Sequence, residues 1–230
     1  MQSGDERLRE VSLARFCVIY YPSIYGFARV MGFTVDDAKD RVQDFFVKVV
    51  EERLLQKYSP QKNTRLSSWL IKCFKNQVLH HLEAQGAKRR GGGVSFVELD
   101  SLYAEARFLN ATAAGGDPAA AFDLTLAQEL WVRAQALLTA KHRGRRSEKL
   151  AEALIPMILH SRWPGPPAPS QGEVAQLCGV TSSTLKAFYH HTLRRQARTC
   201  FDLVAAEHCQ KIAAEELDQL WEILKANVAC

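Results

Sequence analysis

The stretch that decides the fold is TVDDAKDRVQDFFVKVV, residues 34–50. Thr34 is a good N-cap, and Asp36 and Asp37 follow it in the first turn, where negative charge favours the start of a helix. The apolar residues then recur at helical spacing and predict one buried face: Ala38, Val42, Phe45 or Phe46, and Val49. The opposite face carries Asp40, Gln43, Asp44 and Val47. The stretch therefore predicts an amphipathic helix whose exposed side is acidic.

Another helix is predicted before this stretch, over residues 12–30. Its apolar side chains recur at helical spacing, and Gly32 is expected to end it. Pro22 lies inside this range. Because proline has no backbone N–H and its ring clashes with the preceding turn, we expect it to kink or restart the helix.

A third helix is predicted over residues 66–85, where apolar residues recur every four positions: Leu66, Leu70, Phe74, Val78 and Leu82. Trp69 broadens this stripe, which favours a place in the core over a role as a stacking surface. The Ser-Pro and Asn content of YSPQKNT, residues 58–64, predicts a loop before the helix. Gly91-Gly92-Gly93 breaks the helical pattern, so the three helices predict a first domain over residues 8–93.

The second half of the chain begins with a predicted linker. Residues 94–116 become rich in alanine and glycine towards their end, which favours a flexible connection. Asp117 and Pro118 then place an N-cap before a proline at the first helical position, where proline is favoured. They predict a long helix to about Lys141 with its large apolar residues inward: Phe122, Leu126, Leu130, Leu137 and Leu138.

Two further helical segments complete the prediction. Ser147 is expected to cap a helix over residues 148–160 that Pro156 interrupts. Residues 212–230 form a C-terminal tail with an amphipathic pattern: Leu217, Leu220, Trp221 and Leu224. A second domain is predicted over residues 117–211. The fold class is therefore all-α, with two small helical domains joined by a flexible linker.

The strongest local signal lies in the second domain, at residues 170–198. Ser170 and Glu173 have the spacing of a capping box, which opens a short helix. Gly179 permits a tight left-handed turn, and Thr181 caps a second helix. A helix, a turn with glycine and a second helix form the arrangement of a helix-turn-helix motif.

Such a motif sets the start of its second helix against base edges in the major groove of DNA. The side chains expected to face the bases are Ser182, Ser183, Lys186 and His190, and Arg194 and Arg198 are expected to reach phosphates. The residues expected to face the core are Leu185, Tyr189 and Leu193. An ordinary helical hairpin is the alternative. The capping box, the glycine turn and the absence of acids from residues 174–201 favour DNA.

The charge distribution agrees with a nucleic-acid partner. The net charge is only +5, but residues 56–90 hold eight lysines or arginines and a single acid, Glu83. Residues 174–201 hold four basic residues. Helix-sized blocks of one sign commonly meet a polyanion, although a solvated basic face is the alternative for either block taken alone.

The composition excludes several other classes. The chain has 230 residues, of which 47% are hydrophobic and 24% charged, and this balance supports a packed core. No apolar run approaches the roughly 20 residues that cross a bilayer. Residues 1–10 are too polar and charged for a secretory signal. We therefore expect a cytoplasmic protein without a membrane partner.

No catalytic centre, metal site or cofactor is predicted. The cysteines contain no CxxC pair, which argues against a zinc site or a disulfide framework: Cys17, Cys73, Cys178, Cys200, Cys209 and Cys230. The adjacent pairs His80–His81 and His190–His191 point about 100° apart on a helix, so they are not expected to share a metal. The sequence has no Gly-rich phosphate loop, no HExxH and no GxSxG.

Four motifs resemble those of RNA polymerase sigma factors. Residues 36–46, DDAKDRVQDFF, are similar to the DAEDxxQExF signature of that family, and residues 65–76, RLSSWLIKCFKN, to its FxxWLxxIxxN helix. Residues 88–93, KRRGGG, look like the KRGGG that follows in some members, and residues 177–181, LCGVT, are similar to LG(L/V)S. The resemblance covers roughly residues 8–225 in the right order. It points to the short, two-domain extracytoplasmic-function (ECF) type of the sigma-70 family.

The resemblance implies a transcription initiation factor that directs core RNA polymerase to promoters. The core-binding face would dock on the coiled coil of the largest subunit through Asp40, Gln43, Asp44 and Val47. The opened minus-ten strand would contact Lys62, Asn63, Lys72, Lys75, Asn76, Lys88, Arg89 and Arg90. The helix-turn-helix would lie on the minus-thirty-five duplex, beside the polymerase surface that faces upstream DNA. An anti-sigma factor is left open as a further partner.

One departure from the family concerns the third helix. Many members carry an acid four residues after the motif asparagine and basic residues beyond it. This chain has His80, His81 and Glu83 there instead. The departure leaves the minus-ten sequence preference and the strength of melting open.

Two other functions also stay open on the sequence. A stand-alone helix-turn-helix regulator would bind duplex operator DNA tightly without polymerase. A helical adaptor would bind a protein partner through the amphipathic tail, and its binding would be indifferent to salt and to nucleic acid.

Overall fold

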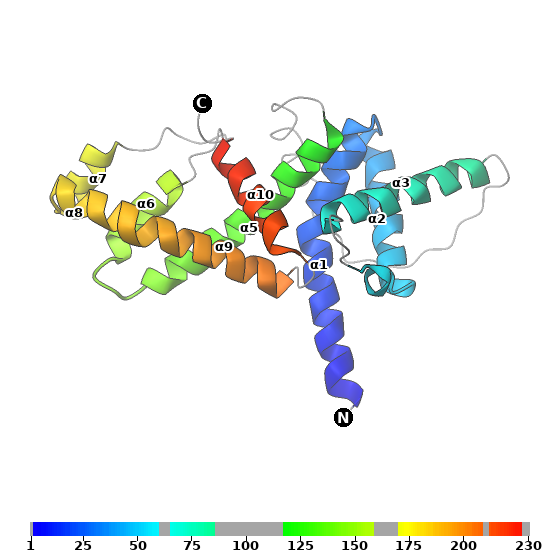
Figure 1. The fold of residues 1–230 in the computed structure, drawn as a ribbon, viewed down its shortest axis with the longest axis horizontal. Coiled ribbons are helices and arrows are strands. Elements are labelled where there is room, and N and C mark those ends of the chain that lie inside the picture. Colours follow the sequence, from blue (N-terminus) through cyan, green and yellow to red (C-terminus); the bar gives the residue numbers. More distant parts are fainter. Residues whose placement is uncertain (1, 60–64, 86–116, 159–169, 209–211, 227–230) are drawn as a thin grey trace. The chain divides into compact units, whose positions relative to one another are not determined.

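The computed structural model describes residues 2–59, 65–85, 117–158, 170–208 and 212–226 (Figure 1). The regular elements in this part of the chain are α1 Gln2–Val30, α2 Val35–Glu51, the 3-10 turn η1 Leu54–Lys57, α3 Leu66–Gln85, α5 Pro118–His142, α6 Glu148–Ile158, α7 Gln171–Cys178, α8 Ser182–Ala187, the π-helical turn η2 Phe188–Leu193, α9 Arg194–His208 and α10 Ala214–Ala226. All of them are helical, so the predicted all-α class is confirmed. None of these helices is long and apolar enough to cross a membrane.

The chain folds into two compact units. Unit 1 comprises residues 1–126 and 211–216, and unit 2 comprises residues 127–210 and 217–230. The helices α5 and α10 therefore contribute residues to both units. The linker predicted at residues 94–116 lies outside the described residues, and the predicted domain limits stay predictions.

The first helix of unit 1, α1, is longer than predicted. It begins at Gln2 rather than near residue 12 and runs to Val30. Pro22 lies inside this helix, and the restart expected there is not found. Proline removes the hydrogen bond to the carbonyl four residues earlier, which belongs to Val18. Val18 is exposed, whereas Pro22 itself is buried.

The turn between α1 and α2 follows the predicted chemistry. Gly32 has a φ of 96°, a left-handed conformation that suits glycine. Thr34 caps α2, because its hydroxyl oxygen accepts the N–H of Asp37 at 3.2 Å. The same hydroxyl donates to the Asp37 carboxylate at 2.8 Å. These local bonds fix where α2 begins and hence which of its faces is exposed.

An aromatic core joins α1, α2 and α3. Phe27, Phe45 and Phe74, one from each helix, are buried. The Phe74 ring lies edge-on to the other two, with its centroid 5.5 Å from that of Phe45 and 6.2 Å from that of Phe27. The predicted buried face of α2 is confirmed, and it includes both Phe45 and Phe46. The predicted limits of α3, Leu66 and Gln85, are confirmed as well.

Aromatic side chains also pack the helices of unit 2. The ring centroid of Trp221 on α10 lies 5.2 Å from that of Phe201 on α9 and 5.9 Å from that of Trp131 on α5. Leu220 and Leu224, on the same helix as Trp221, are also buried. The amphipathic pattern predicted for the tail is therefore confirmed.

Two predictions for this part of the chain are wrong. Leu137 was expected to face inward, but its side chain is 40% exposed. Leu138, which points about 100° away from Leu137 around the helix, is buried, so the core-facing side of α5 ends between the two leucines. Pro156 was expected to interrupt α6, which instead continues through it to Ile158.

The thiol of Cys17 is expected to be unreactive in the folded protein. Burial raises the pKa of Cys17 from 9.0 to about 12, so at pH 8 about one thiol in ten thousand is ionised. Only the thiolate reacts with iodoacetamide, and Cys17 should therefore be labelled only after unfolding. Mass spectrometry of peptides labelled at pH 8, with and without denaturant, measures this. Rapid native labelling at Cys17 would show that the thiol is accessible.

Candidate nucleic-acid and polymerase interface

The four residues predicted to bind polymerase share one face of α2: Asp40, Gln43, Asp44 and Val47. The first three are exposed and Val47 is half-buried. The opposite face of the helix is packed in the core of unit 1. Short oxygen acceptors on a rigid helix suit arginine side chains of a partner, which donate from a planar fork.

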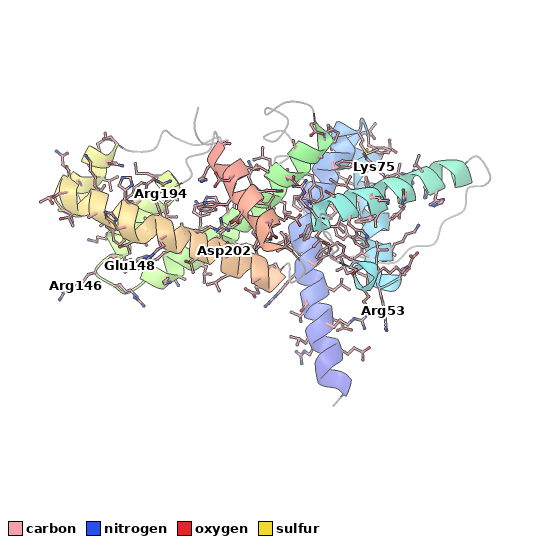
Figure 2. All side chains as sticks on the ribbon, viewed as in Figure 1. Arg53, Lys75, Arg146, Glu148, Arg194 and Asp202 are labelled. Carbon is pink, nitrogen blue, oxygen red and sulfur yellow. The ribbon has the colours of Figure 1, made fainter. Side chains whose placement is uncertain are left out.

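The exposed face of α3 is basic and polar. Lys72, Lys75 and Asn76 are exposed, and they lie within little more than one turn of the helix. Lys75 extends from α3 (Figure 2). Its ammonium lies 5.4 Å from the centroid of the Phe27 ring, a cation–π contact that holds its stem on the helix surface. This face can follow a phosphate backbone and present an amide to a base. The other predicted minus-ten residues lie outside the described residues: Lys62, Asn63, Lys88, Arg89 and Arg90.

Trp69 lies at the edge of the core rather than on the exposed face of α3. Its side chain is half-buried, and its ring centroid is 5.3 Å from that of Tyr58, which is buried. The place in the apolar stripe predicted from the sequence agrees with this packing. A base could stack on Trp69 only through the part of the ring that Tyr58 leaves uncovered.

In unit 2, the segment from α7 to α8 has the predicted local geometry. The Ser170 hydroxyl accepts the Glu173 N–H at 3.2 Å, and the Glu173 carboxylate accepts the Ser170 N–H at 2.6 Å, which together form the capping box. Gly179 ends α7 with a φ of 64°. Thr181 then caps α8 by accepting the N–H of Thr184 at 3.2 Å. Two short helices thus meet at a glycine turn.

The side chains predicted to face bases are exposed: Ser182, Ser183, Lys186 and His190. Leu185 and Leu193 are buried, as predicted. The hydroxyl of Tyr189 donates to the carbonyl of Met157 at 3.0 Å, which ties this segment to α6. These inward contacts leave the opposite side of α8 free to meet a partner.

A π-helical turn, η2, continues α8 into α9. Residues four apart in an α-helix drift by about 40° around its axis, because four residues turn through about 400°. A π-helix has more residues per turn than an α-helix, so each residue turns through a smaller angle. This smaller angle reduces the drift between His190 and Arg194. Arg194 is exposed at the start of α9 (Figure 2). The turn therefore helps to keep Lys186, His190 and Arg194 near one line.

Arg198 differs from the other predicted DNA contacts because acids of unit 2 already engage it. Its Nε donates to Asp202 at 2.8 Å, and its Nη2 donates to Asp218 of α10 at 2.7 Å. The guanidinium also lies 5.6 Å from the centroid of the Trp221 ring. A phosphate would have to compete with two carboxylates for this side chain.

His142 positions the same segment and was missed from the sequence. It is buried at the end of α5, where its two ring nitrogens lie 2.8 Å from the Ser147 hydroxyl and 2.8 Å from Oε1 of Gln196. Its ring packs edge-on to Phe188 of η2 at 5.7 Å. No local pattern could have revealed these contacts, because Gln196 lies 54 residues away in the chain.

The described residues show no grouping of three His, Cys, Asp or Glu side chains that could hold a metal ion. Four cysteines of the described residues are free thiols: Cys17, Cys73, Cys178 and Cys200. Cys209 and Cys230 lie outside the described residues.

Residues 18–88 match the family model for Sigma-70 region 2. Neither a search of curated proteins nor a search of solved structures found a match. The matched range contains α2 and α3 with the two exposed faces described above. Sigma-70 region 2 implies binding to core RNA polymerase and to promoter DNA. The match over residues 18–88 thus supports a sigma-70 family factor, with a role in transcription initiation.

Proposed function

We propose that the chain is a sigma factor of the ECF type, which directs core RNA polymerase to specific promoters and helps to open them. The observation that carries the proposal is the match of residues 18–88 to Sigma-70 region 2, together with the exposure of the acidic face of α2. In this proposal Asp40, Gln43, Asp44 and Val47 dock on the coiled coil of the largest polymerase subunit.

The face of α3 would bind the opened minus-ten strand. Opening duplex DNA costs about 1.4 kcal/mol per base-pair step on average, and a protein offsets this cost by binding the single strand more tightly than the duplex. Lys72 and Lys75 would neutralise phosphates, while Asn76 would read a base edge. Lys62, Asn63, Lys88, Arg89 and Arg90 complete the proposed minus-ten set.

The exposed side of α8 and η2 would bind the minus-thirty-five duplex as the second helix of a helix-turn-helix. Ser182, Ser183, Lys186 and His190 would face base edges in the major groove. Arg194 would reach a phosphate. Arg198 has the least support in this set, since Asp202 and Asp218 hold it.

Two modest DNA-binding sites on one chain raise each other's effective concentration, so neither needs to bind tightly alone. This distinguishes the proposal from its main alternative, a stand-alone regulator that uses the α7–α8 segment. The regulator would bind duplex DNA tightly without polymerase. The sigma factor would bind it weakly until polymerase is present.

Reconstitution tests the proposed function. The purified chain is mixed with core RNA polymerase and a library of genomic fragments, and transcription start sites are mapped. We expect defined start sites that core polymerase alone does not give, preceded by shared sequences near positions minus ten and minus thirty-five. Tight duplex binding without polymerase, and no start sites with it, would establish the regulator instead.

Replacing Lys186 with alanine should alter the preference for upstream sequence. Lys186 is exposed at the end of α8, and one good base contact contributes about 1–3 kcal/mol of discrimination, or roughly 5-fold to 150-fold. Binding of the polymerase complex to a set of minus-thirty-five variants measures the effect. Lys141→Ala, an exposed lysine of α5, is the matched control. Uniform weakening across all sequences would mean that Lys186 contacts only phosphate.

A further inference from the structure

The start of α3 has no acidic residue of its own to cap it. The first turn of the helix contains no Asp or Glu, although its free N–H groups and its dipole favour a negative charge there. Glu216 of α10 supplies that charge from 150 residues away: Oε2 accepts the N–H of Leu66 at 3.0 Å, and Oε1 accepts the N–H of Ser67 at 3.1 Å. Both carboxylate oxygens are therefore used.

The surroundings of this cap are buried and ordered by further contacts within unit 1. Glu216 is 1% exposed, and the Arg65 guanidinium donates to Asp123 at 2.8 Å just before α3 begins. Burial raises the pKa of Asp123, which the nearby Arg65 opposes and the Glu216 charge reinforces. Burial and the charge of Glu216 also raise the pKa of Tyr58. The charge of the Glu216 carboxylate thus raises the pKa of both Asp123 and Tyr58 near the start of α3.

The contacts of Glu216 indicate that it stays bound to the start of α3 in the folded protein. A buried carboxylate is costly unless hydrogen bonds satisfy it, and here two backbone N–H groups do so. Withdrawing Glu216 would also leave those N–H groups in a buried site without their acceptor. Separation would therefore cost hydrogen bonds of both the carboxylate and the N–H groups, which favours the state in which Glu216 caps α3.

We propose that Glu216 is a positioning residue for α3 and that residues 212–216 are a constitutive part of the unit that binds opened DNA. The inference rests on the proposed function of the α3 face. Lys72, Lys75 and Asn76 follow the capped turn by one to three helical turns, so an orderly first turn fixes how they are presented to the strand. The C-terminal segment acts on DNA binding without touching DNA.

The test uses the full chain in complex with core polymerase and two forms of a mapped promoter, one fully duplex and one with a pre-opened bubble at minus ten. Glu216→Ala should weaken binding to the bubble about tenfold and leave binding to a duplex minus-thirty-five fragment unchanged. Glu216→Gln should recover part of the loss, because its amide oxygen can accept one of the two N–H groups while its NH2 group cannot accept the other. Glu215→Ala is the matched control, since Glu215 is the exposed acid next to Glu216.

Hydrogen exchange of the Leu66 and Ser67 amides gives a second readout on the free protein. We expect faster exchange of both amides in Glu216→Ala and of only one of them in Glu216→Gln. Unchanged bubble binding in Glu216→Ala would overturn the inference, whether or not exchange changes. Tighter bubble binding in that variant would also overturn it and would make Glu216 a competitor of DNA phosphate. A wild-type complex that does not prefer the bubble to the duplex would instead overturn the proposed function of α3.

Discussion

Replacing Gln43 and Asp44 with alanine is expected to abolish stable binding of core RNA polymerase while the fold stays intact. Both side chains are exposed on α2, and neither belongs to its buried face. Hydrogen bonds to charged groups contribute about 1.5–3 kcal/mol each, so removing the pair should weaken binding by roughly 100-fold or more. Titration of labelled protein with core polymerase measures the change.

Glu10→Ala is the control for this double substitution. It also removes one negative charge from an exposed helical position, but on α1 rather than on the α2 face. Circular dichroism should show the same helix content for all three proteins, because none of these side chains is buried. If the double variant binds core polymerase as tightly as the wild type, the acidic face of α2 is not the docking surface.

The substitution Phe74→Ala is expected to have the largest effect on stability. Phe74 is fully buried, and its ring packs edge-on against Phe27 and Phe45 at the centre of unit 1. Truncating a buried phenylalanine removes apolar contacts and leaves a cavity, which together cost about 3–5 kcal/mol. That is a large part of the 5–15 kcal/mol by which folded domains are typically stable. Urea unfolding followed by circular dichroism measures the loss.

Leu79→Ala provides the comparison on the same helix. Leu79 is 57% exposed, so its truncation should change the free energy of unfolding by no more than about 0.5 kcal/mol. A loss of less than about 1 kcal/mol in Phe74→Ala would contradict the central place given to the aromatic core.

The elements that the sequence predicted well have their causes nearby in the chain. The hydroxyl of Thr34 finds its N–H three residues later, and the capping box of Ser170 and Glu173 closes over the same distance. α3 carries an apolar residue every four positions, which defines both its length and its buried face. Caps and periodicity depend on short segments, so they can be recognised without knowledge of the tertiary fold.

The errors have physical reasons of a different kind. Residues 6–10 of α1 are exposed and mostly charged, so they carry no apolar spacing from which this part of the helix could be predicted. Pro22 and Pro156 lie inside helices that tertiary packing keeps intact. The buried face of α5 takes in Leu138 and leaves Leu137 exposed, and the width of that face is set by the helices packed around it rather than by the local sequence.

In the candidate site, too, features with local causes could be predicted and contacts between distant residues could not. The exposed residues of α2 and α8 followed from amphipathic spacing, because exposure repeats with the helix. The partners of Arg198 did not, since Asp218 comes from a different helix twenty residues on. The acceptor at the start of α3 could not be predicted from the sequence for the same reason, because Glu216 lies 150 residues away and meets Leu66 only in the folded chain.

That distance along the chain has a consequence for protein synthesis. Ribosomes add roughly 5–20 residues per second, so the 150 residues between Leu66 and Glu216 correspond to a delay of roughly 8–30 seconds. During this interval the nascent polypeptide contains α3 without the carboxylate that completes it. The first turn of α3 therefore gains its Glu216 acceptor only late in translation, long after the helix itself has been made.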